Sequence, residues 1–263
     1  MRFTEVRLAN GLQLHCAETG NSDGPVVLFL HGWPDSWFTF SRVLPLLPDS
    51  VRSIAIDQRG FGESERPKGS YAINDFAEDA IAFLDAMSIR QATIVGHSLG
   101  TFIARRMAIT NPERVDRLVL IASGFSPVSP VLLEAQEAVK DLEDPLPIEF
   151  VRDFQSGTAY TPVPESFMDE VVSESLKAPA RVWRDVVAGL LAYDDARHLA
   201  QISAPTLLLS GDQDALFVPE EQERLANAIP GATLRVYPET GHCPNWERPE
   251  QVAADIAAFV GAT

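Results

Sequence analysis

Residues 92–106 read ATIVGHSLGTFIARR, an apolar run that passes through a Gly-x-Ser-x-Gly motif into a helical pattern. Glycine is disfavoured inside strands and helices because it loses the most conformational freedom on folding. The presence of Gly96 and Gly100 on either side of Ser98 therefore indicates a constraint on the backbone conformation. The motif predicts a sharp strand-to-helix turn that holds the serine hydroxyl clear of the main chain. The glycines are needed where side chains would strike the neighbouring strand and helix.

Several further runs are short and continuously apolar, which is typical of strands buried on both faces of a parallel sheet. Together with the strand before the motif, they are VVLFL (26–30), SIAI (53–56), ATIV (92–95), RLVLIA (117–122), TLLLS (206–210) and TLRVY (233–237). Helical patterns separate many of these runs, and such alternation indicates β–α–β units. The sequence therefore predicts an α/β fold with a mostly parallel central sheet and helices on both faces.

The beginning of the chain has a different pattern. FTEVRL and LQLHCAE alternate between apolar and polar residues on either side of Asn10-Gly11. An Asn-Gly pair between alternating segments favours a tight hairpin turn. We expect a β-hairpin ahead of the parallel strands.

Residues 124–198 interrupt the alternation of strands and helices. This segment contains helix-like stretches such as PVLLEAQEAVKDL, punctuated by prolines, and no good strand. We expect it to form a helical cap inserted into a core made of residues 1–123 and 199–263. An independent second domain is the alternative, but it would require clearer linkers.

Charge and cysteine content restrict the partners and the compartment. The 263-residue chain has a formal net charge of −16. Because nucleic acids and anionic membranes require a basic surface, we expect neither as a partner.

No apolar run approaches the ~18 residues needed to span a bilayer, and the N-terminal residues lack the apolar region of a secretory signal. Cys16 and Cys243 are too few for a disulfide framework and are not spaced like metal ligands. We expect a cytoplasmic protein with free thiols.

A serine hydroxyl is a poor nucleophile unless a base removes its proton, and the usual base is a histidine. His242 follows the last predicted strand and precedes the final helix, the position that this fold class gives to the base. The other four histidines lie in the opening hairpin, ahead of the serine, directly beside it, or at the exit of the cap. They are His15, His31, His97 and His198, in that order. We therefore predict His242 as the base.

The base also needs a carboxylate to fix its tautomer. TLLLSGDQD places Asp212 and Asp214 directly after a buried strand. Asp214 is favoured because its longer loop reaches farther, and Asp212 is the alternative. Asp194 and Asp195, at the end of the cap, are weaker candidates.

Acyl transfer also requires backbone N–H groups for the developing oxyanion. We expect one from Leu99 at the start of the helix after Ser98, where the helix dipole favours negative charge. The loop LFLHGWPDSW after the strand at 26–30 would supply another, from Trp33.

These motifs, together with DQRGFGES (57–64) and GHCPNWERP, resemble the α/β-hydrolase fold family in their order and spacing across essentially the whole chain. The resemblance implies a triad of Ser98, Asp214 and His242, with Trp33 and Leu99 donating to the oxyanion. HGWPDSW is most similar to epoxide hydrolases and haloalkane dehalogenases, but those enzymes carry aspartate at the nucleophile position. Because serine forms an acyl ester that water can cleave, whereas an alkyl ether would be a dead end, the resemblance favours the serine esterase and lipase-like branch.

We therefore predict an enzyme that hydrolyses a carboxylic ester of a small, largely apolar substrate, with no metal or organic cofactor. Four aromatic residues are candidates for an apolar substrate pocket: Trp37, Phe125, Trp183 and Trp246. Lactonases, carbon–carbon bond hydrolases and cofactor-free perhydrolases share the triad and remain alternatives. Outside catalysis, the alternative is a small-molecule receptor that signals through a protein partner.

Overall fold

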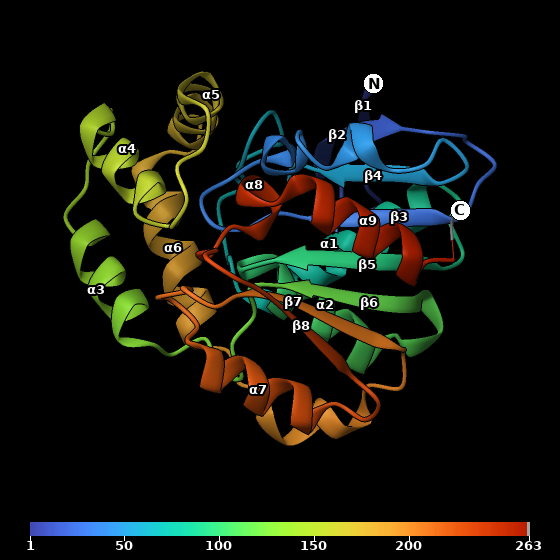
Figure 1. The fold of residues 1–263 in the computed structure, drawn as a ribbon. Helices are drawn as coiled ribbons and strands as arrows, with labels where there is room; N and C mark the ends of the chain where they lie inside the picture. Colours follow the sequence, from blue (N-terminus) through green and yellow to red (C-terminus); the bar gives the residue numbers. More distant parts are fainter. Residues whose placement is uncertain (262–263) are drawn as a thin grey trace.

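The computed structural model describes residues 1–261, and an eight-stranded sheet runs through its centre (Figure 1). The strands are β1 (Arg2–Arg7), β2 (Gln13–Thr19), β3 (Val26–Leu30), β4 (Arg52–Ile56), β5 (Ala92–His97), β6 (Val115–Ile121), β7 (Thr206–Gly211) and β8 (Thr233–Tyr237). Their order across the sheet is β1-β2-β4-β3-β5-β6-β7-β8. β2 is antiparallel to both of its neighbours, and all other pairs are parallel.

Helices connect the strands and surround the sheet. The α-helices are α1 (Ile73–Ala86), α2 (Leu99–Thr110), α3 (Pro130–Val139), α4 (Ile148–Ser156), α5 (Glu165–Leu176), α6 (Ala180–Leu191), α7 (Pro219–Ala228), α8 (Pro244–Glu247) and α9 (Pro249–Phe259). Short 3-10 helices occur at η1 (Trp37–Phe40), η2 (Leu44–Leu46), η3 (Pro112–Arg114) and η4 (Ala196–Gln201).

Alternate residues of the central strands pack against different helices, because successive side chains of a strand point to opposite faces. On β3, Leu28 and Leu30 join the core formed with α1 and α2, whereas Val27 and Phe29 join the core formed with α9. All four are essentially inaccessible to solvent. The prediction of a mostly parallel sheet covered on both faces is confirmed.

The first two strands form the expected hairpin. Arg7 pairs with Gln13 at its closed end, and Gly11 in the turn has a φ of 87°, a value that favours glycine. This hairpin adds the antiparallel edge to an otherwise parallel sheet.

Helices α3 to α6 lie in the segment between β6 and β7, which are hydrogen-bonded neighbours in the sheet. Figure 1 shows these four helices, coloured from green to amber, gathered beyond one end of the strands. We call residues 122–205 the helical insertion. The helix-like stretch ESFMDEVVSESLKAPARVWRDVVAGLLAY (165–193) is divided at Pro179 into α5 and α6, and no periodic pattern in the sequence indicated α4.

Candidate active site

Ser98 lies in a sharp turn between β5 and α2. Its φ is 50° and its ψ is −116°, a strained conformation for a residue with a side chain. A Cβ on Gly96 would lie 2.3 Å from the carbonyl oxygen of Gly100, and one on Gly100 would lie 2.1 Å from that of Leu30. Both glycines are therefore required by close backbone approach, as the motif predicted.

The HGWP loop after β3 lies directly against this turn. A Cβ on Gly32 would meet the Ser98 Cβ at 3.1 Å. His31 holds the loop through two hydrogen bonds. Its Nδ1 donates to the Gly32 carbonyl (2.7 Å), and its Nε2 accepts from the Gln58 N–H (3.0 Å). Burial lowers the pKa of His31 to about 4. His31 is therefore a neutral, fully engaged histidine.

His242 and Asp214 are in direct contact. Nδ1 of His242 lies 3.1 and 3.0 Å from the two carboxylate oxygens of Asp214. The His242 Nε2 is buried and has no hydrogen-bond partner within the described part of the chain. A carboxylate on Nδ1 fixes the tautomer in which Nε2 carries the lone pair, so this nitrogen is able to accept a proton.

The Asp214 carboxylate is held by its own loop. Its Oδ1 accepts from the N–H groups of Leu216 (2.9 Å) and Phe217 (3.0 Å). Asp212 is differently placed, since its Oδ1 accepts from the Thr240 N–H at 3.3 Å. The structure thus brings Asp214, and not Asp212, to the histidine.

The other acidic candidates lie elsewhere. Asp195 forms a buried ion pair with Arg105 on α2. Asp194 turns back on its own loop and accepts from the Ala196 N–H at 3.0 Å. Neither contacts a histidine of the site.

Two backbone N–H groups near Ser98 are available for an anion. Those of Trp33 and Leu99 have no hydrogen-bond acceptor among residues 1–261. Trp33 directly follows Gly32, which adjoins Ser98, and Leu99 is the first residue of α2. The helix dipole adds partial positive charge at Leu99.

A narrow cavity of about 20 Å³ lies above Ser98. Ser98, His97 and His242 line it together with six large apolar side chains: Trp33, Leu132, Phe154, Leu190, Leu216 and Trp246. A cavity needs about 10–15 Å³ to hold one water molecule. The cavity therefore has room for about one water molecule and is too small for an organic substrate.

Asp35 is a further carboxylate in this cavity, and the sequence analysis did not predict it. Its Oδ1 accepts from Nε2 of Gln155 on α4 (2.9 Å), and its Oδ2 lies 3.9 Å from Nδ1 of His97. Burial raises the pKa of Asp35 to about 6, although the hydrogen bond from Gln155 opposes this shift. The only signal in the sequence was its place directly after HGWP.

Of the four aromatic candidates, Trp246 lines the cavity. Trp183 lies one layer behind, with its ring 5.5 Å from that of Trp33. Trp37 packs against Phe3 at the outer hairpin, and Phe125 lies beneath the guanidinium of Arg224. Trp37, Trp183 and Phe125 are not among the residues that line the cavity.

The remaining histidines and the cysteines have other partners. His97 contacts the His242 carbonyl oxygen through Nε2 (3.1 Å), His15 contacts Asp57, and His198 contacts Gln201. Cys16 and Cys243 are buried and unpaired. Burial raises the pKa of the Cys243 thiol, which disfavours the reactive thiolate.

Within residues 1–261, no three histidine, cysteine, aspartate or glutamate side chains converge in a way that would hold a metal ion. The described helices also include none with the length and apolar character needed to cross a bilayer.

Comparison with known proteins yields a match to the model of the alpha/beta hydrolase family over residues 27–255. A non-heme chloroperoxidase of Streptomyces lividans is 28% identical over 285 aligned residues, covering 97% of this chain and 98% of the relative. A 2-hydroxymuconate semialdehyde hydrolase of Pseudomonas sp. (strain CF600) is 31% identical over 270 residues, covering 97% of this chain and 91% of the relative.

A solved structure of a thermophilic esterase from Thermogutta terrifontis superposes with a TM-score of 0.84 at 26% identity, covering 99% of this chain and 98% of that one. The fold predicted from the motifs is therefore confirmed.

Proposed function

Because the chain belongs to the α/β-hydrolase family, a family of enzymes, we propose that it hydrolyses a carboxylic ester of a small, largely apolar molecule through an acyl-enzyme. The proposal rests above all on one observation. Asp214 contacts Nδ1 of His242, while Nε2 of His242 has no hydrogen-bond partner among the described residues, and His242 lines the same cavity as Ser98.

In this mechanism Ser98 Oγ attacks the ester carbonyl carbon and passes its proton to Nε2 of His242. The carbonyl oxygen becomes negatively charged and accepts hydrogen bonds from the N–H groups of Trp33 and Leu99. Asp214 stabilises the imidazolium that forms. When the carbon–oxygen bond breaks, His242 gives the proton to the departing alcohol, and the acyl group remains on Ser98.

Water completes the cycle. His242 removes a proton from a water molecule, which attacks the acyl carbonyl, and the same two N–H groups hold the second oxyanion. Collapse breaks the bond to Ser98 Oγ, which recovers its proton from His242.

The direct test is Ser98→Ala, assayed on p-nitrophenyl acetate beside the wild type. We expect kcat to fall on the order of 10⁶-fold, as it does when the nucleophile of such a relay is removed from a serine protease. A variant that retains wild-type turnover would eliminate the proposal. Sustained turnover by the wild type, rather than a single acylation event, also separates an enzyme from a receptor.

Carbon–carbon bond hydrolysis is the second candidate, because the 2-hydroxymuconate semialdehyde hydrolase of Pseudomonas sp. (strain CF600) is 31% identical to this chain. A hydrolysis panel of acyl esters, lactones and vinylogous diketones separates the two activities. Preferential turnover of the diketones, abolished by Ser98→Ala, would favour the second candidate.

Two further parts of the proposal concern organisation. Residues 124–198 would act as a cap over the core formed by 1–123 and 199–263, supported by the side chains that α3, α4 and α6 place in the cavity. A reducing compartment such as the cytoplasm is proposed because both cysteines are unpaired.

A further inference from the structure

A second cavity, of about 290 Å³, lies beside α3 and has mostly apolar walls. Val131, Ala135 and Ala138 of α3 contribute to it, and their spacing places them along one face of the helix. Ala138 is exposed and Ala135 half-buried, so this face of α3 is only partly covered. We call this cavity the α3 groove.

The α3 groove is adjacent to the catalytic cavity. Four residues line both: Leu132, Phe154, Thr158 and Leu216. A single layer of side chains therefore separates the catalytic cavity at Ser98 from the wider α3 groove.

Two residues of this shared wall are bonded to the proposed acid and base. The N–H of Leu216 donates to Asp214 Oδ1 (2.9 Å), and the carbonyl of Thr158 accepts from the His242 N–H (2.9 Å). The alcohol oxygen must lie near His242 Nε2, because it takes its proton from that nitrogen when it departs. The groove is therefore on the alcohol side of the ester.

Another wall of the catalytic cavity leaves little space. Trp33 and Leu190 line it, and Trp33 packs at 5.5 Å against Trp183, which is fully buried. An acyl group that lies against Trp33 has to be short, because the rings of Trp183 and Phe154 pack against that side chain.

We propose, on the basis of the ester hydrolysis proposed above, that the α3 groove binds the alcohol portion of the substrate. The substrate class is then esters of short carboxylic acids with long, apolar alcohols. The chain of the alcohol passes between Leu132 and Leu216. After the ester carbon–oxygen bond breaks and the alcohol oxygen is protonated, the alcohol leaves through the groove.

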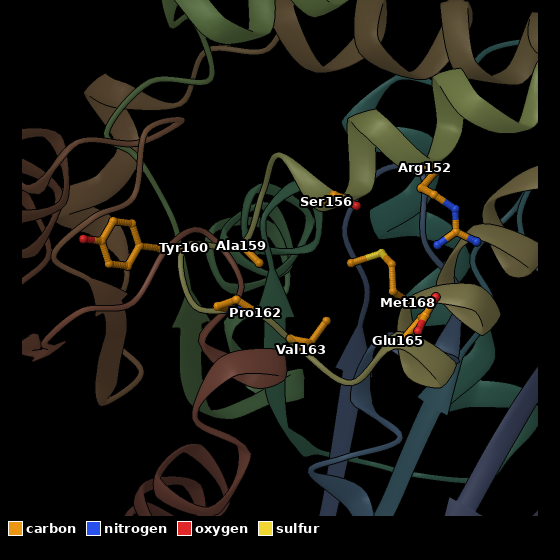
Figure 2. A pocket seen from close by; sticks show the side chains of 8 residues that line it. All are labelled: Arg152, Ser156, Ala159, Tyr160, Pro162, Val163, Glu165 and Met168. Carbon is orange, nitrogen blue, oxygen red and sulfur yellow. The ribbon is translucent and has the colours of Figure 1, made fainter.

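The helical insertion provides a matched control. Figure 2 shows the side chains that line a cavity between α4 and α5, among them Ala159. The volume of this cavity is about 320 Å³. This cavity shares no lining residue with the catalytic cavity, and Arg152 and Glu165 make it more polar. A group added at Ala159 thus occupies a cavity of similar size without entering the proposed path.

The experiment compares Ala138→Cys with Ala159→Cys, each before and after reaction with a bulky maleimide. Because Cys16 and Cys243 are buried, the introduced thiol is the one that reacts, and each unlabelled protein is its own folding control. The measurements are kcat/KM for ethyl, butyl and octyl acetate, and for p-nitrophenyl esters from acetate to octanoate.

We expect kcat/KM of the wild type to rise by about fourfold for each methylene of the alcohol until the groove is filled. Labelling Ala138→Cys should lower the ratio of kcat/KM for octyl acetate to that for ethyl acetate by at least about tenfold. Loss of contact with two methylenes of the alcohol is sufficient for an effect of this size. Labelling Ala159→Cys should leave the ratio unchanged.

Three results would overturn the inference. They are an unchanged ratio after labelling Ala138→Cys, an equal fall in both variants, and a fall confined to the acyl series. In each case ester turnover that depends on Ser98 would leave the proposed function standing. If the wild type cleaves no ester, the proposed function fails and the inference fails with it.

Discussion

The loops at the carboxyl edge of the sheet and the helical insertion above them are held by different kinds of contact. Around Ser98 the main chain itself sets the geometry: the Ser98 N–H donates to the Ile121 carbonyl (3.0 Å), and Gly100 packs against Leu30 without room for a side chain. The insertion is tied to the core largely through side chains, such as that of Gln155 on Asp35.

Arg105 is a buried side chain of the core that contacts both ends of the insertion. This fully buried side chain of α2 donates to the Gly124 carbonyl (2.8 Å) near the start of the insertion and pairs with Asp195 near its end. At the other side, the Glu247 carboxylate accepts from the N–H groups of Tyr160 (3.1 Å) and Thr161. The comparison indicates that main-chain contacts hold the Ser98 turn, whereas side chains supply many of the contacts that hold the insertion. The main-chain bond from the His242 N–H to the Thr158 carbonyl (2.9 Å) adds to these.

Asp214→Asn changes the chemistry without moving the insertion, and of the three substitutions that compare these two regions we expect it to have the largest effect. The neutral amide no longer selects the tautomer of His242, which in a comparable triad costs on the order of 10⁴ in kcat. Asp212→Asn is the matched control, because Asp212 bonds to Thr240 rather than to the histidine. Equal losses in the two variants on p-nitrophenyl acetate would refute the assignment.

Arg105→Ala should act on the insertion instead. It leaves the Asp195 carboxylate buried without a partner, which costs about 3–5 kcal/mol, so the free energy of unfolding in urea should fall by that amount. The control is Arg152→Ala, which removes a solvent-exposed pair with Asp169 and should leave the free energy of unfolding almost unchanged. If the two losses were similar, Arg105 would not be the anchor of the insertion.

Asp35 belongs to both regions, and its substitution should have the smallest effect. Burial raises the pKa of Asp35 to about 6, so the folded protein binds a proton between about pH 4 and 6 that the unfolded chain has already released. This group therefore lowers stability as pH rises through that interval. We expect Asp35→Asn, whose amide oxygen still accepts from Gln155, to be about 1–3 kcal/mol more stable than the wild type at pH 8.

The same variant should match the wild type at pH 4. Urea unfolding at the two pH values measures the difference. Because His97 and His242 also lie near Asp35, the stability of the variant is compared with that of the wild type at each pH. A gain that is equal at both pH values would contradict a titrating carboxylate.

The core was largely predictable from the sequence because local pattern and backbone constraint agree there. The runs at 26–30 and 233–237 match β3 and β8 residue for residue, and the steric reason given for Gly96 and Gly100 is visible in their contacts. Chain order and loop length were also sufficient to select the aspartate that contacts His242.

The insertion was less predictable because its contacts join residues that are distant in sequence. α4 is short and starts directly after Pro147, so its periodicity covers few turns. Gln155 reaches Asp35 across 120 positions, and no local pattern encodes that contact. Trp183 and Trp246 are both tryptophans on helices. Only tertiary packing determines that Trp246, and not Trp183, lines the cavity together with Ser98.

The room for a single water molecule above Ser98 has a kinetic consequence. An organic electrophile is larger than this space, so it meets the hydroxyl only after side chains that line the cavity have moved apart. Even a very reactive acyl or phosphonyl reagent then modifies the protein no faster than this opening occurs. Such shielding protects the resting protein from adventitious acylation, and it makes the frequency of opening an upper limit on turnover.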